Sequence, residues 1–123
     1  MAIGWKLEAG ARARLLAALS PRWPVPVADH ITLRSKGPLP PPANIVAVGE
    51  ADDGEGVQAL VVTVDGSADR PDGGVFHITW SLDRSRGRKA AESNAVIARY
   101  GWRPLAAPLP VDAVPAEWEW VDP

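Results

Sequence analysis

The sequence predicts an α+β domain in which two helices flank a small antiparallel sheet. Three observations lead to this prediction. Apolar residues recur at helical spacing in two segments, and in shorter segments they alternate with polar residues or fill both faces of a strand. Clusters of proline and glycine separate these segments, and the 123 residues include 13 prolines and 11 glycines. Since no linker long enough to divide the chain is evident, we expect one domain over residues 1–123.

Two segments are predicted to be helical. The first covers residues 8–19 and ends at Ser20 and Pro21, and its helical stripe consists of Leu7, Ala11, Leu15, Ala18 and Leu19. The second covers residues 88–99 and ends at Tyr100-Gly101, a pair typical of a helix C-terminus. Its inward residues are expected to be Ala90, Ala91, Ala95, Val96 and Ile97.

Strands are expected in the segments between and after these helices. Alternation of apolar and polar residues, or apolar runs of strand length, predicts strands at 28–34, 44–50, 56–64 and 75–82. The segment 56–64 is apolar on both faces, which is typical of a central strand. A further edge strand is expected in the tail, at 117–121.

Charge and cysteine content narrow the classes of function. The net charge is −2 and the isoelectric point is about 5.6, so a protein that grips long nucleic acid by its backbone is excluded, whereas a small nucleotide or one RNA end is compatible. The absence of cysteine excludes a disulfide scaffold, a thiolate zinc site and a cysteine nucleophile. It also fits a reducing cytoplasm, where we expect the protein. No segment predicts a membrane span or a secretion signal.

The two histidines of the chain occur in the same tripeptide. These are His30-Ile31-Thr32 and His77-Ile78-Thr79, and the histidines lie 47 positions apart. Successive side chains of a strand point to opposite faces, so the histidine and threonine of each motif share a face and the isoleucine points to the other. Two such strands side by side would place two imidazoles and two hydroxyls on one wall of a groove.

This set of groups suits in-line displacement at a phosphodiester. Imidazole titrates near neutral pH, so one histidine can take a proton from water while the other gives a proton to the leaving oxygen. Thr32 and Thr79 are expected to donate hydrogen bonds to the non-bridging oxygens, where negative charge builds up. Two histidines without placed carboxylates make a poor metal site, so we expect neither a metal nor another cofactor.

Paired His-x-Thr motifs on strands resemble the 2H phosphoesterases. The segments around the motifs are also similar, because a helix and a proline-rich stretch precede the first motif and a helix follows the second. The likeness covers about residues 8–100 and is nearest to the cyclic phosphodiesterase domain of fungal-type tRNA ligases. It implies a small 2H-like sheet and hydrolysis of the 2′,3′-cyclic phosphate of RNA ends or nucleotides, with His30, Thr32, His77 and Thr79 as catalytic residues.

Other residues are candidates for binding the substrate. Arg34 shares the face of His30 and is expected to pair with phosphate, Lys36 could assist if the strand extends that far, and Ser81 shares the face of His77. The basic run 84–89 is read as a solvated loop, with an RNA contact as the alternative. Among the six tryptophans, Trp5 and Trp23 are the better candidates for base stacking, and the others are expected to pack in the core or beside the sheet, namely Trp80, Trp102, Trp118 and Trp120.

Two alternatives to this function remain open at this stage. One is hydrolysis of a cyclic dinucleotide or oligonucleotide signal, which uses the same acid–base chemistry. The other is a 2H domain that binds nucleotides without turning them over. The sequence leaves the oligomeric state open, and it does not say which histidine is the base.

Overall fold

The computed structural model describes residues 1–119 and contains two antiparallel sheets and two α-helices, which confirms the α+β class. The smaller sheet has the strand order β3-β1-β8, with bounds His30–Arg34, Ala2–Leu7 and Ala113–Trp118. The larger sheet has the order β2-β6-β5-β4-β7, with bounds Val25–Pro26, His77–Leu82, Val57–Val64, Ile45–Asp52 and Arg103–Val111.

The two sheets correct the expectation of a single sheet. Strand β1 was not predicted, and its pairing with both β3 and β8 makes the small sheet a separate layer. Strand β7 was not predicted either, because its three prolines argue against a strand. It lies at the edge of the larger sheet, where proline is tolerated since no neighbour needs the missing N–H. The tail strand begins at Ala113 and ends at Trp118, earlier than expected, and residues 120–121 lie outside the described residues.

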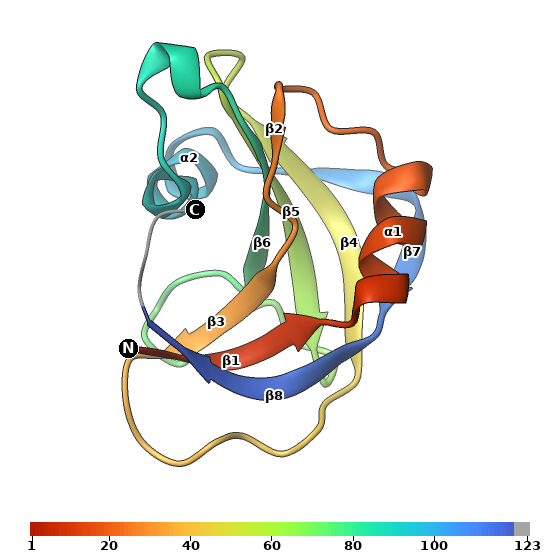
Figure 1. Ribbon diagram of the computed structural model, residues 1–123, viewed down its shortest axis with the longest axis vertical. Coiled ribbons are helices and arrows are strands. Elements are labelled where there is room, and N and C mark those ends of the chain that lie inside the picture. Colours follow the sequence, from red (N-terminus) through yellow and green to blue (C-terminus); the bar gives the residue numbers. More distant parts are fainter. Residues whose placement is uncertain (120–123) are drawn as a thin grey trace.

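In the described part of the chain, four helical segments accompany the sheets. Helix α1, Ala9–Ala18, and helix α2, Ser93–Tyr100, lie on opposite sides of the molecule (Figure 1). Two short 3-10 helices, Arg84–Arg86 and Ala90–Glu92, lead into α2. The second α-helix therefore starts later than residue 88, because Lys89 is extended, with φ −130° and ψ 153°, and residues Ala90–Glu92 form a 3-10 turn.

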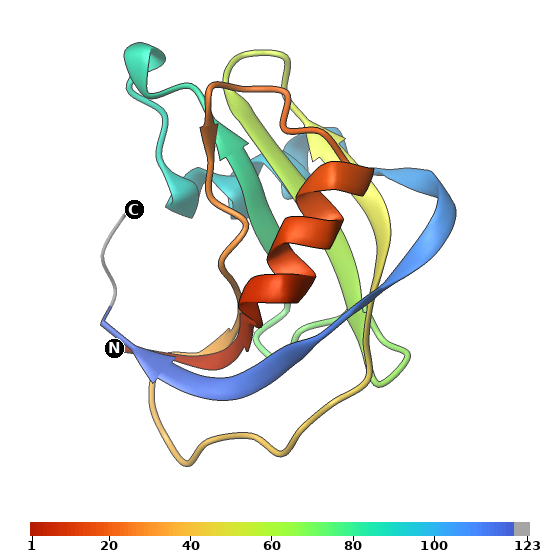
Figure 2. The same ribbon diagram turned by 45° about the vertical axis from the view of Figure 1, so that its right-hand side comes forward.

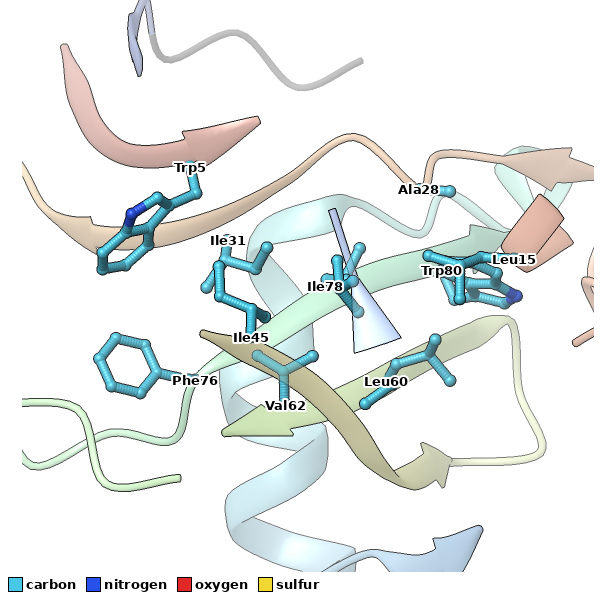
Figure 3. Packing of buried hydrophobic residues seen from close by; sticks show 12 residues of the cluster. Trp5, Leu15, Ala28, Ile31, Ile45, Leu60, Val62, Phe76, Ile78 and Trp80 are labelled. Atoms are coloured by element: carbon cyan, nitrogen blue, oxygen red, sulfur yellow. The ribbon is translucent and has the colours of Figure 1, made fainter. Parts of the chain in front are cut away.

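The main core fills the space between the two sheets. Figure 3 shows Trp5 and Ile31 of the small sheet facing Ile45, Val62, Phe76 and Ile78 from the side of the larger sheet. Ile31 and Ile78, the middle residues of the two motifs, are both fully buried there, as the alternation predicts. Trp80 also faces this core and donates from Nε1 to the Leu19 carbonyl over 2.8 Å, so its predicted position is confirmed.

A second apolar cluster covers the opposite face of the larger sheet. There Val96 and Ile97 of α2 pack on residues of the central strand β5, including Val57, Ala59 and Val61. Strand β5 is buried on both faces over most of its length, which confirms the prediction of a central strand. His77 and Thr79 pair with Val61 and Ala59 on β5, so they lie on this second face, beside α2.

No helix among residues 1–119 is long and apolar enough to cross a membrane.

Candidate functional site

The histidines and threonines of both His-x-Thr motifs line one pocket. Its volume is about 370 Å³, and it lies between the small sheet on one side and β6 with the start of α2 on the other. His30 and Thr32 enter from β3, and His77 and Thr79 enter from β6. The remaining lining residues are Met1, Ala2, Leu33, Arg34, Ser35, Arg70, Asp72, Ala90, Ala91 and Asn94.

The backbone before the first motif explains why the two motifs meet. The chain runs from α1 along β6 and then crosses into β3 (Figure 2). On this path Val27 N–H donates to the Trp80 carbonyl and Ala28 N–H donates to the Thr79 carbonyl, over 2.9 and 3.0 Å. The backbone two residues before His30 is thus hydrogen-bonded to the second motif.

The crossing itself requires an unusual conformation at Ala28. Its φ is +45°, in the left-handed region that residues with a Cβ rarely adopt, and the residue is fully buried. The Arg12 side chain of α1 holds the turn, because Nε donates to the Ala28 carbonyl and an Nη donates to the Val27 carbonyl, each over 3.1 Å. Such strained positions persist when their surroundings hold them, and they cluster at functional sites.

His30 has a carboxylate partner. Its Nδ1 lies 3.0 Å from Asp29 Oδ2, and the same carboxylate oxygen lies 3.6 Å from Lys6 Nζ. The Trp118 ring packs on the imidazole with 4.5 Å between ring centroids, so the His30 side chain is only 17% exposed. Burial lowers the pKa of His30 below its usual value, and the Asp29 carboxylate opposes this by stabilising the imidazolium.

His77 has a backbone partner instead. Its Nδ1 lies 2.8 Å from the Val75 carbonyl. A carbonyl only accepts, so Nδ1 carries the proton and the neutral ring presents a lone pair at Nε2. Burial lowers the pKa of His77, and the charges of Arg70 and His30 act in the same direction, while the Val75 carbonyl and Asp72 oppose them.

The two threonines differ in the state of their hydroxyls. Thr79 is buried, and its Oγ1 lies 2.8 Å from the Ser93 hydroxyl and 3.3 Å from the Ala90 carbonyl. Within residues 1–119 the structure gives the Thr32 hydroxyl no hydrogen-bond partner. Both threonines line the pocket, so only Thr32 presents a hydroxyl that is not already engaged by the described part of the chain.

The three predicted substrate-binding residues have different outcomes. Arg34 lines the pocket, and an Nη of its exposed side chain donates to the Pro38 carbonyl. Lys36 is exposed in the loop after β3 and is not part of the pocket lining, because the strand ends at Arg34 and the alternation stops there. Ser81 is a correction: it is fully buried away from the pocket, where it donates to Gln58 Oε1 over 2.6 Å and accepts from the Trp23 N–H.

Three pocket residues were not predicted as binding residues. Arg70 and Asp72 come from the loop between β5 and β6, and Asn94 comes from the first turn of α2. Arg70 Nε donates to Asp72 Oδ1 over 2.8 Å, and its Nη2 donates to Asn94 Oδ1 over 3.0 Å. A loop residue carries no periodic signal, so only its position before Gly73-Gly74 and the second motif could have suggested Arg70.

The structure also tests part of the predictions for the tryptophans and for the basic run 84–89. Trp5 is buried in the core, with its ring edge-on to Phe76, so the stacking prediction for it is wrong. The guanidinium carbons of Arg22 and Arg86 lie 4.7 and 5.3 Å from the centroid of the Trp23 ring, and Trp23 is not part of the pocket lining. Trp102 covers Gly49 of β4, at a distance that leaves no room for a Cβ there, and Trp120 lies outside the described residues.

The basic run 84–89 contributes to the fold at Arg88. This side chain forms ion pairs with Glu92 and Asp53, over 2.6 and 2.7 Å, and donates to the Glu55 carbonyl. Arg88 therefore links the 3-10 helix Ala90–Glu92 to the turn after β4. Arg86 forms an ion pair with Asp83 over 3.1 Å, and its side chain is about half exposed.

Among residues 1–119, no group of three or more histidine, cysteine, aspartate or glutamate side chains is placed to hold a metal ion. The polar groups of the pocket lining are two imidazoles, three hydroxyls, two guanidinium groups, one amide and one carboxylate, and the imidazoles and guanidinium groups are suited to acid–base chemistry and anion binding.

In comparisons with known proteins, no family model, no curated protein and no solved structure matches the chain.

Proposed function

We propose that the protein is a metal-independent phosphodiesterase that hydrolyses the 2′,3′-cyclic phosphate of RNA ends or nucleotides. One observation carries the proposal: the two imidazoles and two hydroxyls of the repeated tripeptide line a single pocket, although they come from different sheets. The arrangement leaves each histidine on its own wall, so one can serve the attacking water and the other the leaving oxygen. Its likeness to the 2H phosphoesterases rests on the paired motifs and on the order of the segments around them.

The different partners of the histidines suggest different roles. Asp29 stabilises the protonated form of His30, which suits the general acid. Within residues 1–119 no carboxylate bonds to the His77 ring, and the charge of Arg70 disfavours its protonation, which suits the general base. In this scheme His77 Nε2 takes a proton from water, the water oxygen bonds to phosphorus, and the bond to one ribose oxygen breaks as His30 protonates that oxygen.

The hydroxyls and cations would stabilise the charge on the non-bridging oxygens. Thr32 can donate directly. Thr79 donates to the Ala90 carbonyl in the structure, so it can donate to a phosphate oxygen only by giving up that bond while it accepts from the Ser93 hydroxyl. Such donors act where charge develops, in a site from which water is largely excluded. A pocket of about 370 Å³ is near the lower end for ligand sites, which favours one nucleotide unit over a cyclic dinucleotide.

The test is turnover on a panel of substrates in the presence of EDTA. The panel contains 2′,3′-cyclic mononucleotides, a short RNA with a cyclic phosphate end, and a cyclic dinucleotide. We expect a phosphomonoester product from the first two. His30→Asn and His77→Asn should each lose at least ~100-fold in kcat, because general acid–base catalysis typically contributes that much.

Arg14→Ala is the matched surface control, because Arg14 pairs with Asp112 over 3.0 Å and both side chains are largely exposed. Its turnover should equal that of the parent protein. Nucleotide binding without turnover on the whole panel would instead identify a non-catalytic domain. Turnover of the cyclic dinucleotide alone would favour the signalling nucleotide, and loss of activity in EDTA would contradict the metal-independent mechanism.

A further inference from the structure

We infer that Arg70 and Asn94 form the seat for the phosphate oxygens in this pocket, in place of the Arg34 that the sequence predicts. The inference rests on the proposed function, because it names the part of that site which binds the charged group of a nucleotide. Its ligand class is a phosphate ester or free phosphate. Neither residue belongs to the repeated tripeptides.

Arg70 is fixed before any ligand binds. Its side chain is only 11% exposed, and its guanidinium is held by Asp72 at Nε and by Asn94 at Nη2. The loop is closed beneath it, because the Arg70 N–H donates to the Gly74 carbonyl and Gly73 N–H donates to the Arg70 carbonyl. A side chain held in this way loses little entropy when an anion binds, which raises affinity.

The guanidinium retains donors for a ligand. Within residues 1–119 the structure gives Nη1 no hydrogen-bond partner, and Nη2 has a second N–H besides the one that bonds to Asn94. Two neighbouring N–H groups on the outer edge of a guanidinium match two oxygens of one phosphate. Arg70 therefore keeps a bidentate edge although Asp72 and Asn94 hold its other side.

Asn94 is turned by Arg70 so that it offers a donor. Its Oδ1 accepts from Arg70, and an amide has its oxygen and its nitrogen on the same carbon. The Nδ2 group is therefore the part of the Asn94 side chain that remains for a ligand in the pocket. Guanidinium and amide together give a wall that donates and does not accept, which suits phosphate oxygens.

The absence of a side chain at Gly74 keeps the guanidinium in place. A Cβ at this position would lie 2.5 Å from Arg70 Nη2, 3.0 Å from Cζ and 3.1 Å from Nε. Gly74 is therefore required by the close approach of Arg70. Arg34 differs from Arg70 in each respect, because its side chain is exposed at the rim and bonds to the loop carbonyl of Pro38.

The position of Arg70 also links the seat to the reacting groups. His77 is within electrostatic reach of Arg70, His30 and Asp72, and these are the charged or titratable groups that act on its ionisation. The two arginines and one aspartate of the lining give the pocket a net positive charge in a chain of net charge −2. An anion is thus attracted into the pocket, where Arg70 lies close enough to His77 to affect its ionisation.

The test is binding of inorganic phosphate and of adenosine 2′- and 3′-monophosphate by calorimetry, with the His77 ring followed by NMR. Arg70→Ala should weaken binding at least ~10-fold, because charge-assisted hydrogen bonds are lost. Gly74→Ala should weaken binding similarly although it removes no functional group. Asn94→Asp, which can still accept from Arg70 but offers no donor, should do the same. Arg14→Ala is the control of equal charge change and should bind as the parent protein does.

Two readouts separate a seat from a merely structural arginine. Arg70→Ala should raise the pKa of His77, since a nearby positive charge is removed, and Arg70→Lys should restore that pKa while recovering binding only in part. Circular dichroism and thermal unfolding should show that Arg70→Ala and Gly74→Ala remain folded. Gly74→Ala keeps the charge, so it tests the geometry even if Arg70→Ala is unstable.

The outcomes distinguish this inference from the proposed function. Phosphate binding that depends on Arg70, in a protein without turnover on any substrate, would support the seat and contradict the enzyme. Turnover that is unchanged in kcat and KM by Arg70→Ala and Gly74→Ala would overturn the seat and leave the enzyme standing. Equal binding of phosphate by the parent and Arg70→Ala, or no binding of phosphate and nucleotides by the parent, would also overturn the seat.

Discussion

The two motifs share a tripeptide, but their surroundings differ at each functional atom. The first lies on β3, at the edge of the small sheet, and its histidine is held by the Asp29 carboxylate and the Trp118 ring. The second lies on β6, inside the larger sheet, and its histidine is held by the Val75 carbonyl. The Thr79 hydroxyl is engaged by Ser93, whereas that of Thr32 has no partner among residues 1–119.

These differences show that two copies of one motif need not have the same role. The tripeptide determines which side chains share a face, and this part is the same in both motifs. The neighbours then decide which imidazole has a carboxylate that offsets the effect of burial on its cation, and which hydroxyl is available to a ligand. On this basis we assign the acid role to His30 and the base role to His77, and we expect unequal effects when equivalent residues of the two motifs are changed.

The largest inequality is expected between the threonines. Thr32→Val should lower kcat by about 100-fold, because an oxyanion donor is lost, and should change the free energy of unfolding by less than about 0.5 kcal/mol. Thr79→Val should in addition affect stability. It should lower the free energy of unfolding by about 1–3 kcal/mol, since it leaves the buried Ser93 hydroxyl without this partner. Steady-state kinetics and urea unfolding of both variants measure the two effects.

Ser93→Ala and the double variant Thr79→Val/Ser93→Ala provide the control for this comparison. The two changes should be less than additive in the free energy of unfolding, because both remove the same hydrogen bond. Equal destabilisation by Thr32→Val and Thr79→Val would show that the two hydroxyls are equivalent, and it would contradict the difference between the two motifs.

A smaller inequality is expected from the partners of the histidines. Asp29→Asn keeps the size of the side chain and removes the charge that stabilises the His30 imidazolium. The pKa of His30 should fall further, and activity near neutral pH should fall on the order of tenfold, since one pKa unit changes the protonated fraction by that factor. The basic limb of the pH–rate profile should move to lower pH.

The charge change of Asp29→Asn also affects Lys6, which lies 3.6 Å from the carboxylate. Lys6→Met is therefore the matched control, and it should leave the basic limb in place or move it slightly to higher pH, since a cation near His30 is removed. An acidic limb that moves with Asp29→Asn, in place of the basic limb, would assign the base role to His30.

Much of the fold was predictable because the spacing of apolar residues along the sequence indicates which side chains of a helix or strand are buried. The faces of Ile31, Ile78 and Trp80, the central position of β5 and the two α-helices all follow from spacing. The division into two sheets did not follow, because it depends on which strands pair. That pairing is set by β1, whose pattern is interrupted by Gly4, and by the strained turn at Ala28, which has no sequence signal.

The site was predictable only where it lies on strands. Alternation placed each histidine beside its threonine, but the same rule failed at Ser81, because the pairing of β6 with β5 shifts register between Thr79 and Ser81 and the Ser81 hydroxyl bonds to Gln58. It also failed beyond Arg34, where the strand ends before Lys36. Arg70 and Asn94 reach the pocket from a loop and a helix, so no periodic pattern connects them to the histidines.

The smallest expected effect concerns stability at mildly acidic pH. The pKa values of both histidines are lowered in the fold, mainly by burial, so between the folded and the unfolded pKa the unfolded chain binds more protons. Stability should therefore fall as the pH drops below about 6.5, the usual histidine pKa. The aspartates with lowered pKa values, Asp53, Asp72 and Asp83, act at lower pH, near and below the usual carboxyl range.

The two histidines should contribute unequally to this loss. Urea unfolding between pH 7.5 and 5.5 should show a flatter pH dependence for His77→Asn than for His30→Asn, because Asp29 offsets the burial of His30. Asparagine is chosen because its amide can keep the hydrogen bond made by Nδ1. A steeper dependence in His77→Asn than in the parent protein would contradict the lowered pKa.

The proposal that the two histidines have opposite roles is tested most directly by comparing two substrates with different leaving groups. Turnover of a 2′,3′-cyclic nucleotide is measured beside that of a nucleoside phosphodiester with a p-nitrophenyl leaving group, which departs without a proton. His30→Asn should lose at least ~100-fold on the cyclic substrate and stay near the parent rate on the aryl ester, whereas His77→Asn should lose activity on both. Equal losses of the two variants on both substrates, or rescue of His77→Asn by the aryl ester, would contradict the assignment of opposite roles to the two motifs.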